Sequence, residues 1–201
     1  MIEVVERRAR VGLELVDAIT GGPIIGASRV VVGGADIDVR RANRARWLVE
    51  NVSLPLMTFV VDAEHYVTET IDVMTPPEAD PGVLVEVVLT PRTGYPFAAS
   101  LTRVVGQVVI DATGLPASGA DVTVTPARGG SPGTPLATRS TDDGQYVMWF
   151  LPDPAASPPI ADRYRVDAQL PDGGITLSGS LSLRPLQAGR RNDAPVLRLF
   201  P

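Results

Sequence analysis

A short pattern of turn residues occurs twice in this chain, once in each half, and it constrains the fold more than any other feature. The first copy reads Asp17, Thr20-Gly21, Pro23 and Gly26-Ala27, and the second reads Asp111, Thr113-Gly114, Pro116 and Gly119-Ala120. Asp and Gly favour a turn after a strand, Pro sets φ for the next bend, and the small Gly-Ala pair allows close backbone approach. Val88-Leu89-Thr90-Pro91 and Arg198-Leu199-Phe200-Pro201 also match. We therefore interpret the chain as two copies of one unit.

Alternating apolar residues predict β-strands in both halves, and no segment has a helical period over three turns. The expected strands of the first half are 11–15, 30–32, 59–63, 70–73 and 83–89. Those of the second half are 104–110, 122–124, 146–148, 164–166, 175–177, 181–183 and 196–199. Residues 38–50 are interpreted as a polar loop that enters a strand at Trp47. The fold class predicted is all-β, with two tandem β-sandwiches.

The boundary between the units is expected in the segment Pro91-Arg92-Thr93-Gly94-Tyr95-Pro96-Phe97. Its prolines and glycine restrict the backbone, and its two aromatic residues offer surfaces for packing. The segment is interpreted as a short, stiff connector. We expect a first unit over 1–92, a connector over 93–102 and a second unit over 103–201.

The composition argues against several classes of function. All 18 basic residues are arginine, which excludes Schiff-base chemistry and lysine-derived isopeptide bonds. The formal net charge is −5, whereas phosphate contact needs a clustered positive field, so no nucleic-acid partner is expected. There is no cysteine, no apolar run long enough to span a bilayer and no signal-peptide core at the start. A soluble, cytoplasmic protein without membrane insertion is expected.

No residue set in the sequence is suited to catalysis or to a cofactor. His65 is the single histidine and is interpreted as a turn or surface residue. The serines lack a nucleophile motif and a base. Asp142-Asp143-Gly144 has the composition of a weak calcium site, but a β-turn is the favoured interpretation. We expect no enzyme activity, no metal and no cofactor.

Two groups of residues are candidates for binding a partner protein. The first is the cluster Arg40, Arg41, Arg44, Arg46 and Trp47, because arginine and tryptophan are frequent interface anchors. Its alternative interpretation is a solvated loop, with Trp47 filling the first core. The second group comprises the connector residues Tyr95 and Phe97, together with Trp149 and Phe150. Trp149 and Phe150 are adjacent, so on a strand they point to opposite faces, and one of them is expected to be exposed or covered by the loop 152–159.

The second half contains the second copy of the turn pattern, then Thr141-Asp142-Asp143-Gly144-Gln145-Tyr146 and Tyr164-Arg165-Val166-Asp167-Ala168. With these segments it resembles the carboxypeptidase regulatory-like domain. The resemblance implies that the tandem units are Ig-like or transthyretin-like sandwiches, with seven or eight strands in that family. It covers 103–201 well and 9–91 more weakly, with Arg46-Trp47-Leu48-Val49 in the place of Gln145-Tyr146-Val147-Met148. Enzymes with this fold use several histidines, and related pilins use a lysine bond. This chain can supply neither set.

The tandem arrangement with its Gly94-Tyr95-Pro96-Phe97 junction is also similar to proteins associated with contractile phage-tail-like injection particles. That resemblance implies a cap-adaptor or accessory component, bound in several copies to other protein subunits of a large assembly. The alternative function is a carbohydrate- or surface-binding module. Few aromatics and the expected lack of export argue against the alternative.

Overall fold

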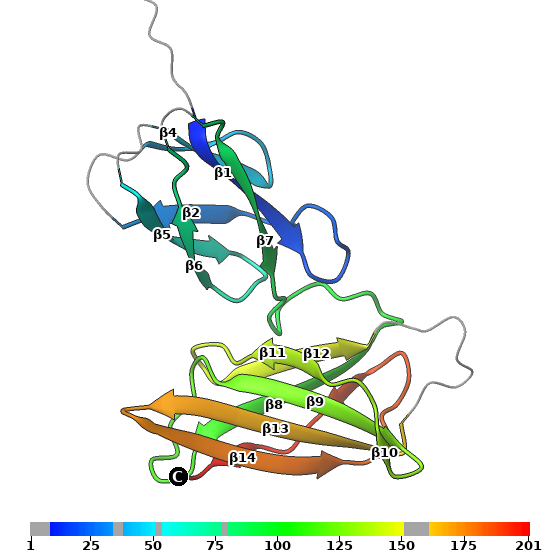
Figure 1. The fold of residues 1–201 in the computed structure, drawn as a ribbon. Coiled ribbons are helices and arrows are strands. Elements are labelled where there is room, and N and C mark those ends of the chain that lie inside the picture. The colour runs from blue at the N-terminus through cyan, green and yellow to red at the C-terminus, as the bar shows by residue number, and fades with distance from the viewer. Residues whose placement is uncertain (1–8, 34–37, 51–53, 78–79, 151–160) are drawn as a thin grey trace, which may run out of the picture. The chain divides into compact units, whose positions relative to one another are not determined.

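The computed structural model of the protein describes residues 9–33, 38–50, 54–77, 80–150 and 161–201. Every regular element within these ranges is a β-strand, as the alternating patterns predict. The chain divides into two compact units, Met1–Pro91 and Arg92–Pro201. The residues of the expected connector, 93–102, are therefore grouped with the second unit. Each unit is built from two β-sheets (Figure 1).

The first unit places its first strand in the middle of a sheet. This sheet has the order β3-β4-β1-β7, with β3 (Asp38–Arg41), β4 (Arg46–Glu50), β1 (Ala9–Asp17) and β7 (Val83–Leu89). β1 is antiparallel to β4 and parallel to β7. The other sheet has the order β2-β5-β6, with β2 (Ser28–Val32), β5 (Leu56–Ala63) and β6 (Glu69–Met74). Inward side chains such as Leu13 and Phe59 are fully buried and form the core.

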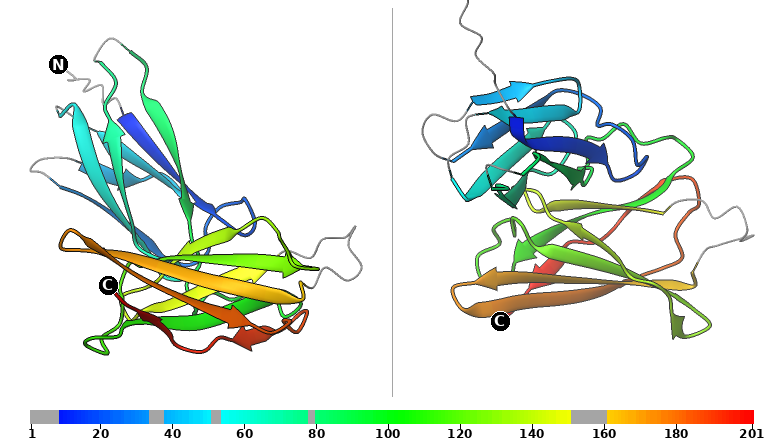
Figure 2. Two further views of the ribbon diagram at one scale, coloured as in Figure 1. Left: turned by 60° about the horizontal axis from the view of Figure 1, so that its bottom comes forward. Right: turned by 45° about the horizontal axis from the view of Figure 1, so that its top comes forward.

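The second unit repeats this plan with more strands. β8 (Thr102–Ile110) lies between β12 (Gln145–Phe150), which is antiparallel to it, and the parallel strands β15 (Arg191–Asp193) and β16 (Leu197–Leu199). The other sheet contains β10 (Ser131–Pro132), β9 (Asp121–Arg128), β13 (Arg163–Asp172) and β14 (Ile175–Leu183), and β11 (Leu136–Arg139) also pairs with β9. Figure 2 shows the two layers from further directions. Val108, Tyr146 and Val166 are among the buried residues between them.

The repeated turn pattern has the same backbone geometry in both units. An isolated bridge joins Val16 to Pro23 in the first unit and Val109 to Pro116 in the second. The glycines of the pattern all have positive φ, namely Gly21 (66°), Gly26 (77°), Gly114 (68°) and Gly119 (70°). Only glycine adopts this conformation without steric cost, which explains its use at these corners. The duplication inferred from the sequence is therefore present in the structure.

The sequence alignment of the two copies matches Asp17 with Asp111, and the structure shows that this match is wrong. Asp17 pairs with Leu89, and the residue that pairs with the equivalent Leu199 is Ile110, not Asp111. One additional residue separates Asp17 from its glycine, so the sequence alignment slips by one position. Asp17 is fully buried, whereas Asp111 is exposed to solvent and forms an ion pair with Arg198 at 3.0 Å.

Buried Asp17 organises the corner of the first unit. Its carboxylate accepts hydrogen bonds from the backbone N–H of Ile19 at 2.7 Å and of Thr20 at 3.2 Å. It also accepts one from the hydroxyl of Tyr66 at 2.8 Å. The Tyr66 oxygen accepts in turn from the N–H of Ile25 at 3.1 Å. This network joins the corner to the loop that follows β5.

Tyr146 of the second unit is buried without such a network. It lies opposite Gly106 on β8, where a Cβ atom would come within 2.5 Å of the tyrosine ring and hydroxyl. The missing side chain of Gly106 thus makes room for the ring. Among the described residues no group hydrogen-bonds the Tyr146 hydroxyl. Burial raises the pKa of this hydroxyl to about 12.

Two expectations about strands are wrong. Residues 38–41 form β3 and pair with β4, so residues 38–50 are a β-hairpin and not a polar loop. Val39 supplies the half-buried apolar position, and four long arginine side chains obscure the alternation in the sequence. Residues 175–183 form one strand and not two. Gly179, which suggests a break, lies where the carbonyl oxygen of Arg198 would be 2.1 Å from a Cβ atom.

The same hydroxyl deletion should have opposite effects in the two units. Tyr66→Phe removes a donor to buried Asp17 and should lower the free energy of unfolding of the first unit by about 1–3 kcal/mol. Tyr146→Phe removes a hydroxyl without a partner and should leave the second unit equally or more stable. Urea denaturation of each variant measures this. Equal losses in both variants would contradict the assignment of the two hydroxyls.

Alkaline pH should destabilise the second unit through Tyr146. Below pH 10 the tyrosine is protonated in both states, so it contributes no pH dependence. Between pH 10 and 12 the unfolded state releases its proton first, so unfolding becomes easier by about 2–3 kcal/mol. Tyr146→Phe should remove this part of the decline. Denaturation midpoints measured from pH 9 to 12 test it, and an identical decline in both proteins would contradict it.

Candidate functional site

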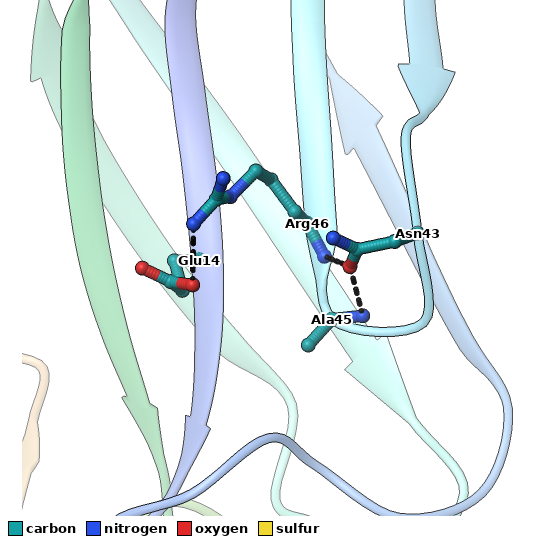
Figure 3. Close-up of polar contacts among 4 residues, drawn as sticks. All are labelled: Glu14, Asn43, Ala45 and Arg46. Carbon is teal, nitrogen blue, oxygen red and sulfur yellow. Dashed lines mark hydrogen bonds and ion pairs between the residues drawn. The ribbon is translucent and has the colours of Figure 1, made fainter.

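The predicted arginine cluster lies on the hairpin formed by β3 and β4. Arg40 and Arg41 are on β3, Arg44 is in the turn, and Arg46 is on β4. The side-chain oxygen of Asn43 accepts hydrogen bonds from the N–H of Ala45 at 3.0 Å and of Arg46 at 2.9 Å (Figure 3). An asparagine that caps its own turn in this way fixes the hairpin.

Two of the four guanidinium groups form ion pairs with described residues of the unit. Arg46 pairs with Glu14 of the neighbouring strand β1 at 2.8 Å, across the sheet (Figure 3). Arg40 pairs with Glu50 at 3.1 Å, and the Glu50 side chain is only 6% exposed. These arginines therefore neutralise carboxylates of their own sheet.

Arg41 contacts both the turn of the hairpin and the ring of Trp47. Its guanidinium donates to the carbonyl oxygens of Asn43 at 3.1 Å and Arg44 at 2.9 Å. It also lies 5.9 Å from the ring centroid of Trp47, a cation–π contact. Trp47 is half-buried and donates from Nε1 to the hydroxyl of Ser28 at 3.4 Å. The solvated loop of the alternative interpretation is instead a β-hairpin, and Trp47 is only half-buried.

Arg44 differs from the other three arginines. It is exposed, and within the described ranges its side chain forms no ion pair. An interface that uses the whole cluster stays a prediction, because the side chains of Arg40, Arg41 and Arg46 already have partners within the unit.

Trp149 and Phe150 point to opposite faces of their sheet, as their adjacency predicts. Phe150 packs toward the core and meets Tyr164 edge-on, with ring centroids 5.3 Å apart. Trp149 points outward and meets Phe97 at 6.5 Å. The loop 152–159, expected to cover one of them, lies outside the described residues.

The outward tryptophan belongs to a group of side chains that we call the aromatic cluster, comprising Tyr95, Phe97, Arg103 and Trp149. Tyr95 and Phe97 are in ring contact at 4.9 Å, and the guanidinium of Arg103 lies 5.0 Å from the Phe97 ring centroid. Arg103 is directly opposite Trp149 on β8. The sequence analysis selected the three aromatic residues but missed Arg103, which only the strand register brings to them.

The backbone edge of β12 is a further feature that the sequence analysis missed. β4 in the first unit is paired on both sides, with β1 and β3. β12 is paired with β8 alone. Arg46 and Trp47 face Glu14 and Leu13 on β1 as Gln145 and Tyr146 face Gln107 and Gly106 on β8, so the two strands are equivalent. The second unit therefore ends in an unpaired edge where the first unit has an additional strand.

Asp143 and His65 each lie in a turn of their own unit. The Asp143 carboxylate accepts from the Thr141 hydroxyl and from the N–H of Gln145, and Gly144 has a φ of 74°. This is the expected turn, and the Thr141 hydrogen bond lowers the pKa of Asp143. His65 lies half-buried in the turn after β5, as expected. Within the described ranges no three His, Cys, Asp or Glu side chains gather as metal ligands.

A shallow hollow of about 350 Å³ lies at the hairpin of β9 and β10. Its lining includes Pro126, Arg128 and Ser131, with no histidine or carboxylate beside the serine. The described residues also contain no helix that is long and apolar enough to cross a membrane.

No protein-family model matches the chain, and no curated protein sequence matches it either. Among solved structures, it is similar to a 9R-lipoxygenase from Cyanothece (14% identity, TM-score 0.36), with 54% of this chain and 18% of that chain covered. It is also similar to the Bacillus anthracis TIE protein (10%, 0.35), with 96% and 34% covered. A third similar structure is the shaft pilin SpaA from Lactobacillus rhamnosus GG (9% identity, TM-score 0.31), with 96% of this chain and 97% of that chain covered. The chain thus spans a fifth to a third of the first two proteins, and likenesses of this size carry no argument about function.

The arginines of the hairpin should differ in their effect on stability. Arg40→Ser removes an ion-pair partner of the buried Glu50 carboxylate and should lower the free energy of unfolding of the first unit by about 1–2 kcal/mol. Arg44→Ser is the matched control and should change it by less than about 0.5 kcal/mol. Thermal and urea denaturation measure both variants. A destabilising Arg44→Ser, or a neutral Arg40→Ser, would contradict the roles assigned here.

Proposed function

We propose that this chain is a non-catalytic structural adaptor that docks onto a larger protein assembly. The observation that carries the proposal is the outward-facing aromatic cluster of the second unit. Tryptophan, tyrosine and arginine are the residues most often found at the energetic centres of protein interfaces. Trp149 is not needed in the core, because Phe150 already supplies the inward aromatic residue at the end of β12.

The chemistry of the remaining polar residues supports a structural role. Asp17, Glu50 and Asp143 hold a corner, a hairpin and a turn. Each of these carboxylates thus maintains local backbone geometry. The proposal therefore assigns the chain to binding and not to turnover.

The assembly we propose is a contractile phage-tail-like particle in the bacterial cytoplasm, with this chain as a cap-adaptor or accessory component present in several copies. Support for this finer proposal comes from the sequence alone, through the tandem arrangement and the Gly94-Tyr95-Pro96-Phe97 junction. Symmetric tubes present the same site many times, which suits a small repeated adaptor.

Carbohydrate binding, the alternative function, would use the same rings. The plane of Phe97 is tilted by 59° from that of Tyr95 and by 43° from that of Trp149. The three rings therefore do not form one flat platform for a sugar, and this geometry favours the protein-docking proposal.

Fractionation of a lysate from the native host tests this proposal. The tagged chain should sediment with particles far larger than itself, and Phe97→Ser/Trp149→Ser should move at least about nine-tenths of it to the soluble fraction. Leu115→Ser, which changes a residue that is 61% exposed outside the aromatic cluster, is the control and should sediment normally. Thermal unfolding of both variants checks the fold. A wild-type chain found only in the soluble fraction would contradict the proposal.

A further inference from the structure

Strand β7 forms one edge of its sheet in the first unit (Figure 1). It pairs with β1 along its whole length, from Val83 to Leu89, and with no other described strand. No described strand except β1 makes more than marginal contact with it. The sheet of the first unit therefore ends at β7 on this side.

The hydrogen bonds to β1 determine which backbone groups of β7 face outward. The N–H of Ala18 donates to the carbonyl oxygen of Leu89 at 3.2 Å, so Leu89 and the alternate residues before it bond to β1. The N–H and C=O groups of Leu84, Glu86 and Val88 consequently point away from β1. Within the described ranges no backbone group bonds to these three residues from the outer side.

The same three residues are open to solvent. Leu84 is 52% exposed, Val88 is 51% exposed, and Glu86 is exposed as well. Their side chains lie on the outer face of the sheet, since the alternate residues Val87 and Leu89 are buried in the core. The outward backbone groups of β7 thus belong to residues that an incoming strand can reach.

The equivalent edge of the second unit is interrupted. Its two short strands, β15 and β16, are separated by Ala194-Pro195-Val196, and proline has no N–H for a further strand. Arg198, which takes the place of Val88, forms an ion pair with Asp111. Short strands, prolines and charges are the usual protection of an edge, and β7 has only one charge, Glu86.

Glu86 is an acidic residue in need of a cation. It lies opposite Glu14 on β1, and Glu14 pairs with Arg46 on the next strand at 2.8 Å. No described residue forms an ion pair with Glu86. This row across the sheet therefore ends in a carboxylate without a counter-charge. A further strand beside β7 would supply the cation, as β4 does for Glu14.

We propose that the edge of β7 receives an extended segment of a partner protein, with a basic side chain opposite Glu86 and apolar side chains opposite Leu84 and Val88. Strand addition is a general mode of recognition in which the backbone supplies affinity and alternate side chains supply specificity. The order apolar, basic, apolar is the same in both directions, so it applies to a segment of either direction. The inference goes beyond the proposed function, because it assigns a second contact surface that does not depend on the aromatic cluster.

A second copy of β7 fits this edge poorly. Two β7 strands in full antiparallel overlap would place Glu86 opposite Glu86, with Leu84 opposite Val88. Like charges directly opposite each other destabilise a strand pair. A basic segment replaces this repulsion by attraction, so charge complementarity favours a foreign segment over a second copy.

Selection of a displayed library of random decapeptides against the full chain tests the proposed charge. Selected peptides should share an Arg or Lys with an apolar residue two positions before it and two positions after it. They should bind Glu86→Arg at least about tenfold more weakly than the wild-type chain, with Glu86→Gln between the two. Selection against Glu86→Arg should instead enrich Asp or Glu at the centre of the pattern.

Two substitutions of Val88 test the backbone bonds. Val88→Pro removes an outward N–H and keeps the bonds to β1, whereas Val88→Thr keeps this N–H and nearly the same side-chain shape. Selected peptides should bind Val88→Pro at least about tenfold more weakly than Val88→Thr. In the wild-type chain they should slow hydrogen exchange at the amides of Leu84, Glu86 and Val88, a measurement that holds even if the proline variant unfolds.

Several results would overturn this inference. One is undiminished binding to Glu86→Arg, another is equal binding to the two folded Val88 variants, and a third is a selection without any peptide that protects the three amides. A concentration-dependent dimer that Val88→Pro abolishes would make the occupant a second copy and would also overturn it. The selection uses the purified chain, so its failure leaves sedimentation through the aromatic cluster untouched. A chain that never sediments, in turn, leaves the peptide result standing.

Discussion

The parallel pairing of the last strand of each unit with its first strand is the interaction on which the rest of the structure depends. β7 pairs with β1 over Val11 to Asp17, and β15 and β16 pair with the two parts of β8. Both first strands are thereby hydrogen-bonded on both sides and direct fully buried side chains such as Leu13 and Val108 into the cores. Burial of this kind is the main favourable contribution to folding.

The units diverge at the strand that precedes β4 in the first unit and β12 in the second, namely β3 and β11. In the first unit that strand completes the sheet, and its arginines neutralise or cover groups of the same sheet. In the second unit Ser140 directs it to the opposite sheet. The first unit thus has an additional strand at this edge, whereas in the described part of the second unit β12 is hydrogen-bonded only to β8.

Much of the fold could be predicted from local pattern. Alternation identified the central strands, and turn residues located both corners, since these features depend on neighbours in the chain. The match of Arg46-Trp47-Leu48-Val49 with Gln145-Tyr146-Val147-Met148 is confirmed by the strand registers. The opposite directions of Trp149 and Phe150 followed from strand geometry alone.

The remaining features depend on contacts between distant segments. Whether β3 or β11 joins a given sheet is decided by hydrogen bonds such as those of Ser140, which no local pattern reveals. The burial of Asp17 depends on Tyr66, 49 residues away. Arg103 reaches the aromatic cluster only through the β8–β12 register. The arginine-rich hairpin was misread because ion pairs with Glu14 and Glu50 are invisible until the strands are paired.

Residue-resolved hydrogen exchange of the free chain tests the central claim most directly, by comparing the central strands β1 and β8 with outer strands. The account predicts that the amides of Leu13 and Val108, on strands that are hydrogen-bonded on both sides, exchange among the slowest of their units. Exchange at Leu13 and Val108 as fast as at Val39 of the outer strand β3 would contradict the account.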